Sequence, residues 1–143
     1  RQAIHIAHAE GFSVMAHANG AETVIAACEE KVDSIEHGAY LNEEALCAMA
    51  EAGTVWVPTL STIGNLRGRG RFREEEVEKI LESAMKNVRR FAALGGLIAP
   101  GTDAGAWAVP HGSLTEYALL LEALGEDTDA LLEKGITVIR EKF

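Results

Sequence analysis

The sequence is poor in cysteine and in basic residues, and each shortage narrows the class of protein. Two cysteines among 143 residues are too few for a disulfide-stabilised scaffold, and the spacing of Cys28 and Cys47 does not match a zinc site. We therefore expect two free thiols in a reducing, cytoplasmic compartment. The net charge of -9 disfavours a nucleic-acid partner, because phosphate binding needs a basic surface.

Long apolar runs are also missing, and so is an initiator methionine. No run approaches the roughly 20 apolar residues of a membrane-spanning helix, so we expect no membrane partner. Hydrophobic residues nevertheless make up 48% of the chain, which indicates a globular domain with a core. The chain begins at Arg1 within a helical pattern, and we expect further residues upstream of it.

Four short apolar segments alternate with helical patterns along the chain. The expected strands are 12–18, 32–36, 54–60 and 97–100. Helical patterns cover 1–10, 21–31, 42–53, 74–94 and 114–124, and a final amphipathic stretch runs to residue 143. This alternation predicts an α/β fold with a parallel sheet covered by helices. It fits half of an eight-unit βα barrel; a small doubly wound sheet is the alternative, although the first strand lacks the Gly-x-Gly-x-x-Gly phosphate signature.

Three polar residues follow the ends of these apolar segments, and their side chains are typical metal ligands. His17 and His37 occupy comparable places in the first two units, one βα repeat apart, and Asp103 lies between glycines after the last strand. The carboxyl ends of parallel strands meet at one edge, so the three side chains are expected together. The pattern predicts a metal site, although Asp103 alone is equally typical of a turn or a helix cap.

Four strings of the sequence together resemble one enzyme superfamily. They are MAHANG around His17, SIEHG around His37, Pro58-Thr59-Leu60, and the GTDAG string that contains Asp103. They are similar to motifs of the amidohydrolase superfamily, in the branch of imidazolonepropionase-like enzymes and metal-dependent Xaa-Pro or Xaa-Arg dipeptidases. The resemblance implies a TIM-type (β/α)8 barrel, of which these strings would be strands five to eight. Residues 1–143 would then form a single C-terminal half-barrel of an amidohydrolase catalytic domain.

The resemblance also implies roles for individual residues. His17 and His37 would bind one or two divalent ions, with zinc as the expected metal, and Asp103 would be both a ligand and the general base. Tyr40 would contact a substrate carboxylate, and His111, with Trp107, would line the pocket from the loop after the last strand. The implied activity is hydrolysis of a C–N bond in a small-molecule substrate, a dipeptide or a cyclic amide, by metal-activated water. A mononuclear deaminase-type reaction is the alternative.

The chain departs from the family pattern in two ways that limit what it does alone. It lacks the His-x-His motif of the first strand and the metal-bridging lysine of the fourth. The 143 residues alone are therefore expected to be inactive, and a non-catalytic half-barrel stays an alternative. A half-barrel has two open edges, here 12–18 and 97–100, and we expect its inner face to expose Val14, Ile35 and Val57. These features predict a homo-oligomer.

Overall fold

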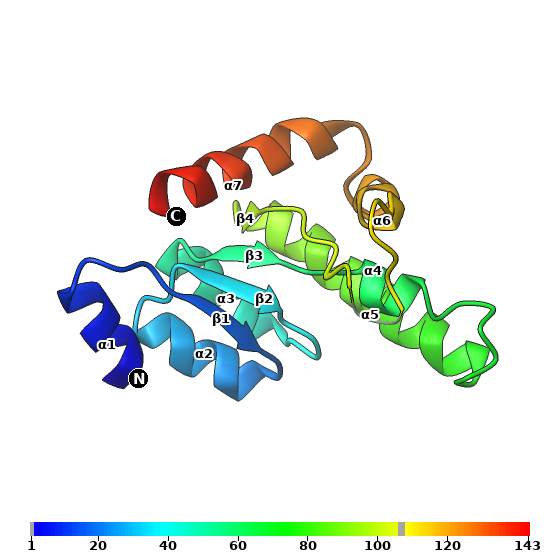
Figure 1. The fold of residues 1–143 in the computed structure, drawn as a ribbon, viewed down its shortest axis with the longest axis horizontal. Coiled ribbons are helices and arrows are strands. Elements are labelled where there is room, and N and C mark those ends of the chain that lie inside the picture. The colour runs from blue at the N-terminus through cyan, green and yellow to red at the C-terminus, as the bar shows by residue number, and fades with distance from the viewer. Residues whose placement is uncertain (1, 106–107) are drawn as a thin grey trace.

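The computed structural model describes residues 2–105 and 108–143 and contains a four-stranded parallel sheet in the order β1-β2-β3-β4 (Figure 1). The strands are β1 (Met15–Ala18), β2 (Ser34–His37), β3 (Val55–Val57) and β4 (Leu97–Ile98). The helices are α1 (Gln2–Ala9), α2 (Ala21–Glu29), α3 (Glu43–Ala52), α4 (Ser61–Gly64), α5 (Glu74–Ala93), α6 (Thr115–Leu124), the 3₁₀ turn η1 (Gly125–Asp127) and α7 (Thr128–Lys142). None of these described helices combines the length and apolar character needed to cross a membrane.

Local sequence explains where the helices begin and end. In α3, the Asn42 side chain accepts a hydrogen bond from the Ala45 N–H at 3.0 Å, and Gly53 ends the helix in the left-handed conformation. In α5, three acidic residues occupy the first turn, where they complement the helix dipole. The apolar stripe of α5 is buried as its spacing predicts: Val77, Leu81, Met85, Val88 and Phe91.

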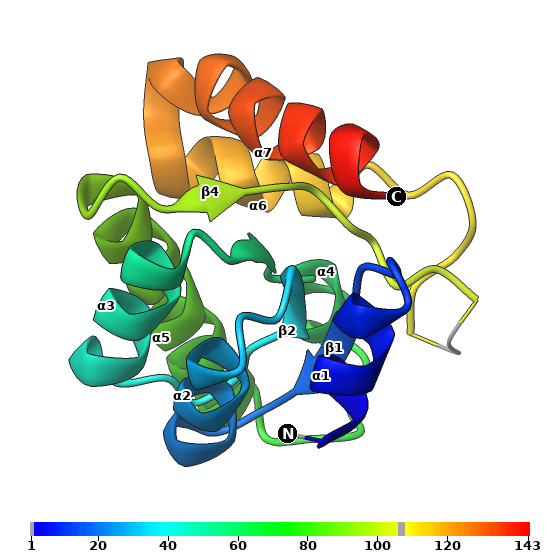
Figure 2. The same cartoon turned by 90° about the vertical axis from the view of Figure 1, so that its left-hand side faces the viewer.

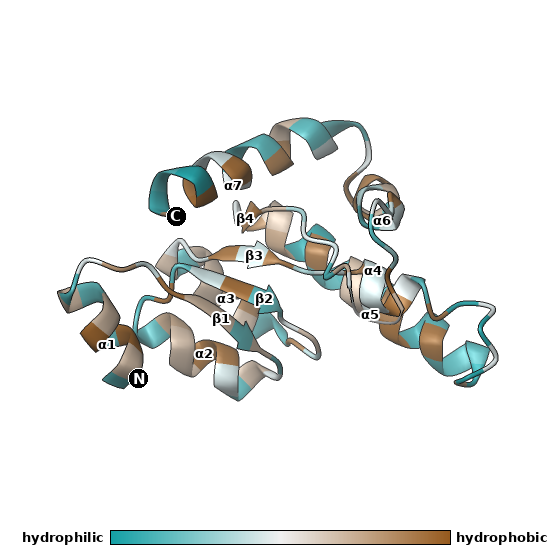
Figure 3. Ribbon diagram, viewed as in Figure 1, coloured by the Kyte–Doolittle hydropathy of each residue, from teal (hydrophilic) through white to brown (hydrophobic). Residues whose placement is uncertain are grey.

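Helices cover both faces of the sheet at β3 and β4. On one face, Ile35, Trp56 and Ile98 are paired by the strand register and belong to the main core between the sheet and helices α2, α3 and α5. On the other face, α7 packs onto Val55, Val57 and Ala99 through the apolar residues Ile136, Val138 and Ile139. Figure 2 shows α6 and α7 above β4 and α3 and α5 below it, and Figure 3 shows hydrophobic turns of α7 between hydrophilic ones.

The packing of α7 depends on one glycine. A Cβ atom at Gly135 would lie 2.1 Å from the carbonyl oxygen of Ile98. Only a residue without a side chain allows the helix to approach the β4 backbone this closely. This single position therefore lets α7 close one face of the sheet.

The α/β class with parallel strands is confirmed, but the strands are shorter than the sequence predicts. The third strand stops at Val57 because Pro58 has no N–H to donate to the sheet, and α4 begins soon after, at Ser61. The first strand begins at Met15, and residue 12 lies before it. Apolar runs therefore overestimate strand length where they continue into the loops.

The expectation of an open apolar inner face is wrong for two of its three residues. Ile35 is fully buried on the helix-covered face, and Val57 is buried beneath α7, while Val14 is half-buried. The expected edges are confirmed, because β1 and β4 end the strand order. Exposed apolar side chains gather instead near β1, where Phe12 is 69% exposed and Met15 is 49% exposed. Self-association of the chain stays a prediction.

At the amino ends of the strands, Asp33 joins three distant parts of the chain. One of its carboxylate oxygens accepts hydrogen bonds from the Val14 N–H at 2.8 Å and is 2.8 Å from the His8 Nε2. The other accepts from the Lys142 ammonium at the end of α7. Asp33 is only 7% exposed, so these contacts replace most of its hydration.

Candidate functional site

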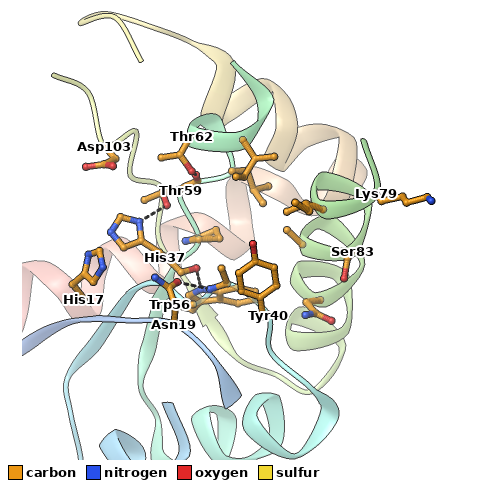
Figure 4. Close-up of a pocket in the computed structure, with 18 residues that line it drawn as sticks. His17, Asn19, His37, Tyr40, Trp56, Thr59, Thr62, Lys79, Ser83 and Asp103 are labelled. Carbon is orange, nitrogen blue, oxygen red and sulfur yellow. Dashed lines mark hydrogen bonds between the residues drawn. The ribbon is translucent and has the colours of Figure 1, made fainter. Parts of the chain in front are cut away.

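His17 and His37 meet at the carboxyl end of the sheet, as the sequence predicts. Their ring centroids are 4.4 Å apart, with the ring planes at 68° (Figure 4). The strand register pairs His17 with Glu36 and Ala18 with His37, so the two histidines are one position out of step. The His37 backbone has a φ of +70°, which turns it out of the strand pleat. The His37 side chain, which a regular strand would place on the opposite face of the sheet, thereby reaches the His17 ring.

Hydrogen bonds fix the position of His37. Its Nδ1 lies 2.7 Å from the Thr59 hydroxyl oxygen, and its carbonyl oxygen accepts from the Trp56 indole N–H at 2.8 Å. The next loop is held by Asn19, whose side-chain oxygen accepts from the Ala39 N–H at 2.8 Å. Where Nδ1 carries the proton, Nε2 is left with a free lone pair, which is the arrangement of a metal-binding histidine.

Strained backbone is concentrated at this end of the sheet. Among the described residues other than glycine, five have a positive φ: Lys31, His37, Tyr40, Thr59 and Asp103. The last four all line the same pocket. Each such conformation costs free energy, and it persists only where the surrounding structure enforces it. The clustering therefore marks this pocket as the candidate functional site.

Asp103 lies on the loop after β4, lines the pocket and is exposed to solvent. The preceding Thr102 carbonyl accepts a hydrogen bond from the Ser61 hydroxyl at 2.8 Å. Gly101 is required for the path of this loop, because a Cβ there would lie 2.3 Å from a methyl group of Val57. The loop thus brings a carboxylate to the edge of the sheet where the two histidines meet.

The electrostatic environment favours a neutral His37. Burial lowers the pKa of His37 below 6.5, and the nearby His17 lowers it further, while the charges of Asp103 and Glu36 oppose the shift. The neutral imidazole is the form that offers a lone pair to a metal ion or accepts a proton.

His17, His37 and Asp103 carry side chains that can bind a metal ion, and the structure brings the two histidines together. Two adjacent imidazoles and a carboxylate on one pocket are ligands that zinc accepts. Within residues 2–105 and 108–143, however, no three His, Cys, Asp or Glu side chains converge closely enough to hold a metal ion. The histidine pair is therefore brought together, and the three-residue metal site stays a prediction.

The pocket beside the histidines has a volume of about 470 Å³, within the range of small-molecule sites. Its apolar wall consists of Trp56, Pro58, Leu60, Ile63, Ile80 and Ala84. Tyr40 stands on the rim and is 73% exposed. His111 is exposed and does not line this pocket; its ring lies beside Gly105. Trp107 falls outside the described residues.

Sequence reasoning missed the residues that support the site. Thr59 belongs to a recognised motif, but nothing in the motif reveals its contact with His37. Trp56 looks like an ordinary apolar strand residue, although its N–H holds the His37 carbonyl. Glu116 lies in the first turn of α6, within the helical pattern 114–124, yet it is only 1% exposed. Burial of an acidic residue is a tertiary property, and no local pattern predicts it.

No protein-family model matches the chain. Uncharacterised proteins of Mycobacterium tuberculosis and Mycobacterium bovis are 29% identical to it over 131 residues, which cover 87% of this chain. The chain spans only about a third of the length of these relatives, 35%.

Solved structures are similar over nearly the whole chain. A Xaa-Pro dipeptidase with methionine bound in its active site is 27% identical, with a TM-score of 0.77 over 97% of this chain and 36% of that one. A prolidase complexed with N-methylphosphonate-L-proline is 26% identical, with a TM-score of 0.74 over 96% of this chain and 35% of that one. An amidohydrolase at 22% identity, with a TM-score of 0.76 over 96% and 35% of the two chains, shares the fold.

These neighbours confirm the predicted fold class, since the four parallel βα units correspond to part of a TIM-type barrel. The Xaa-Pro dipeptidase and the prolidase, at 27% and 26% identity, are both hydrolases. Nearly all of this chain matches about a third of the length of each. Fold, motifs and neighbours together support the amidohydrolase superfamily for this chain.

Proposed function

We propose that the complete protein is a metal-dependent hydrolase of a C–N bond that acts on a dipeptide or a cyclic amide. The observation that carries the proposal is the meeting of His17 and His37, at 4.4 Å between ring centroids, in a strained pocket that Asp103 also lines. The similarity to a Xaa-Pro dipeptidase and a prolidase supports this class of substrate.

The chain's own residues suit this chemistry. Divalent zinc held by His17 and His37, with Asp103 beside them, would supply a Lewis acid that polarises the scissile carbonyl and lowers the pKa of water. The Asp103 carboxylate is exposed to the pocket, where it can take a proton from water and pass it to the leaving nitrogen. Thr59 holds the His37 ring, and the apolar wall can receive an uncharged side chain of the substrate.

Zinc binding by the 143-residue chain tests the metal part of the proposal. We expect calorimetric titration to show zinc binding that weakens at least tenfold in His17→Ala and in His37→Ala, because each removes a ligand. His111→Ala is the matched control, since this histidine lies outside the pocket. Equal zinc affinity in all four proteins would contradict the site, and absence of binding in the wild type would favour a non-catalytic half-barrel.

Hydrolysis of Xaa-Pro dipeptides and of a cyclic amide by the complete protein tests the reaction. Asp103→Asn should lower kcat by about 10²–10⁴-fold, because an amide cannot accept the proton. Asp127→Asn is the matched control in the exposed turn η1. A kcat of Asp103→Asn within tenfold of wild type would rule out the general-base role.

A further inference from the structure

A buried carboxylate lies behind the candidate site, and no step of the proposed reaction uses it. Glu116 is the second residue of α6 and is only 1% exposed. Carboxylates are rarely buried to this extent unless they hydrogen-bond to a fixed partner. One of its oxygens, Oε2, accepts from the backbone N–H of Ser61 at 2.6 Å. The other, Oε1, has no hydrogen-bond partner among the described residues.

Ser61 connects this carboxylate to both halves of the site. Its hydroxyl donates to the Thr102 carbonyl at 2.8 Å, and Asp103 is the next residue along the chain. Ser61 also follows Thr59 by two residues, and the Thr59 hydroxyl contacts Nδ1 of His37 at 2.7 Å. The carboxylate therefore lies one contact from the turn that orients His37 and two contacts from the loop that carries Asp103.

Both segments that depend on this contact are strained. Thr59 has a φ of +48° and Asp103 a φ of +50°; positive φ is uncommon for any residue other than glycine and is least favourable for a β-branched residue such as Thr59. Strain of this kind relaxes unless neighbouring groups hold the backbone in place. The Glu116–Ser61 hydrogen bond anchors the start of α4, which follows Thr59 and contacts the loop of Asp103.

We propose that Glu116 is a positioning residue, which acts through Ser61 to hold the Thr59 turn and the Asp103 loop so that His37 and Asp103 face one pocket. The inference rests on the proposed function only for the identity of His37 and Asp103 as the working groups. Burial raises the pKa of Glu116 to about 7, opposed by the hydrogen bond from the Ser61 backbone. Ionised or neutral, the side chain keeps an oxygen that accepts from the Ser61 N–H.

Two substitutions at Glu116 separate positioning from mere filling of space. Glu116→Gln keeps a carbonyl oxygen as acceptor, whereas Glu116→Leu keeps similar bulk and removes the acceptor. Glu122→Leu, on the exposed surface of the same helix, is the matched control. The readouts are the ¹⁵N resonances of the His37 ring, which report its contact with Thr59, and the zinc affinity of the 143-residue chain.

Glu116→Leu should shift the His37 ring resonances and weaken zinc binding about 10- to 100-fold, as loss of a supporting partner does at metal sites. Glu116→Gln should restore both readouts to within about threefold of wild type, and Glu122→Leu should change neither. Wild-type resonances and zinc affinity in a folded Glu116→Leu protein would overturn the proposal. If His37→Ala leaves zinc binding intact, the proposed function fails, while the ring resonances still decide the role of Glu116.

Ser61→Ala provides the decisive variant if Glu116→Leu does not fold. It removes the hydroxyl that holds the Thr102 carbonyl and keeps the backbone N–H that Glu116 accepts from. We expect the Asp103 and Ala104 backbone amide resonances to shift while the His37 ring resonances stay in place. Unchanged Asp103 and Ala104 amides would overturn the link to the loop, and the positioning role with it.

Discussion

The two ends of the sheet are built on opposite principles. At the amino ends, Asp33 is buried and receives hydrogen bonds from a loop N–H, a histidine and the Lys142 ammonium. At the carboxyl ends, Asp103 is exposed, and its backbone is held in a left-handed conformation. The first arrangement satisfies a carboxylate with partners, and the second keeps a carboxylate accessible at the cost of strain. Under the proposed function, the groups that stabilise the fold and those that do chemistry would occupy separate ends of the strands, as in barrel enzymes generally.

The contacts that hold each end also differ in sequence distance. Asp33 joins His8 and Lys142, which are 134 residues apart in the chain, so it closes the whole fold. The carboxyl-end contacts link loops of adjacent units, such as Asn19 with Ala39. Loss of the Asp33 contacts should therefore lower the free energy of global unfolding, whereas loss of the carboxyl-end loop contacts should alter the pocket.

Replacing the two aspartates in turn is the strongest test of this division. We expect Asp33→Ala to lower the free energy of unfolding by about 3 kcal/mol, because it removes the buried carboxylate that Val14, His8 and Lys142 all contact and leaves the partly buried Val14 N–H without its acceptor. Asp103→Asn should change it by less than about 0.5 kcal/mol, since the side chain is exposed. Urea titration followed by circular dichroism measures both. Equal losses in the two variants would contradict the division.

The two ends should also respond to pH in opposite directions. Burial raises the pKa of Asp33, but hydrogen bonds from Lys142, His8 and Val14 outweigh it and hold the pKa below 3.8. Its contribution to stability is therefore complete above the unfolded-state value of 3.8 and is lost as the pH falls from there through the lower folded-state pKa. Glu116 behaves oppositely: its pKa is about 7 when folded against 4.5 when unfolded, so the folded state binds the extra proton and loses stability as the pH rises between these values.

The Glu116 effect should reach about 3 kcal/mol across that window, at about 1.4 kcal/mol per pH unit. Urea titrations between pH 3 and 8 should show this decline in the wild type and not in Glu116→Gln, which cannot ionise. Asp33→Asn should separately reduce the loss of stability below pH 4, to which Glu43, with its own lowered pKa beside Arg90, also contributes. Parallel curves for the wild type and Glu116→Gln would show that this carboxyl does not titrate abnormally.

Two glycine substitutions compare the strained pocket with an ordinary helix end. Gly38→Ala should cost about 2 kcal/mol, because φ is +59° and the new Cβ would lie 2.6 Å from the Trp56 indole nitrogen. Gly53→Ala has a similar φ of +66° but meets no atom within 4 Å, so about 1 kcal/mol is expected. Urea titration gives both values. Trp56 fluorescence, recorded in a Trp107→Phe background, should change only in Gly38→Ala.

The smallest expected effect concerns the rim of the pocket. Tyr40→Phe in the complete protein should raise KM for dipeptides about three- to tenfold and leave kcat unchanged, because the lost hydrogen bond exists in both ground and transition states. Tyr117→Phe is the control, since its hydroxyl donates to Asp129 on α7. An unchanged KM across several dipeptides would remove Tyr40 from substrate binding and favour a cyclic amide.

The sequence alone determined the class of fold and the meeting of the histidines. Alternating apolar and amphipathic segments predict parallel βα units, because strand and helix periodicities are local. The spacing of His17 and His37 predicts their common edge, since parallel strands end on the same side. The α3 cap at Asn42 and the apolar stripe of α5 follow from the same local rules.

Tertiary structure alone decided which residues support the site and what covers the sheet. Packing of α7 on Val57 brings together residues about 80 positions apart, and the contact that buries Glu116 beside Ser61 joins residues 55 positions apart. The positive φ values of His37 and Thr59 are imposed by neighbouring elements against the preference of each residue. Local patterns describe what a segment prefers by itself, whereas burial and strain arise only when distant segments compete for the same space.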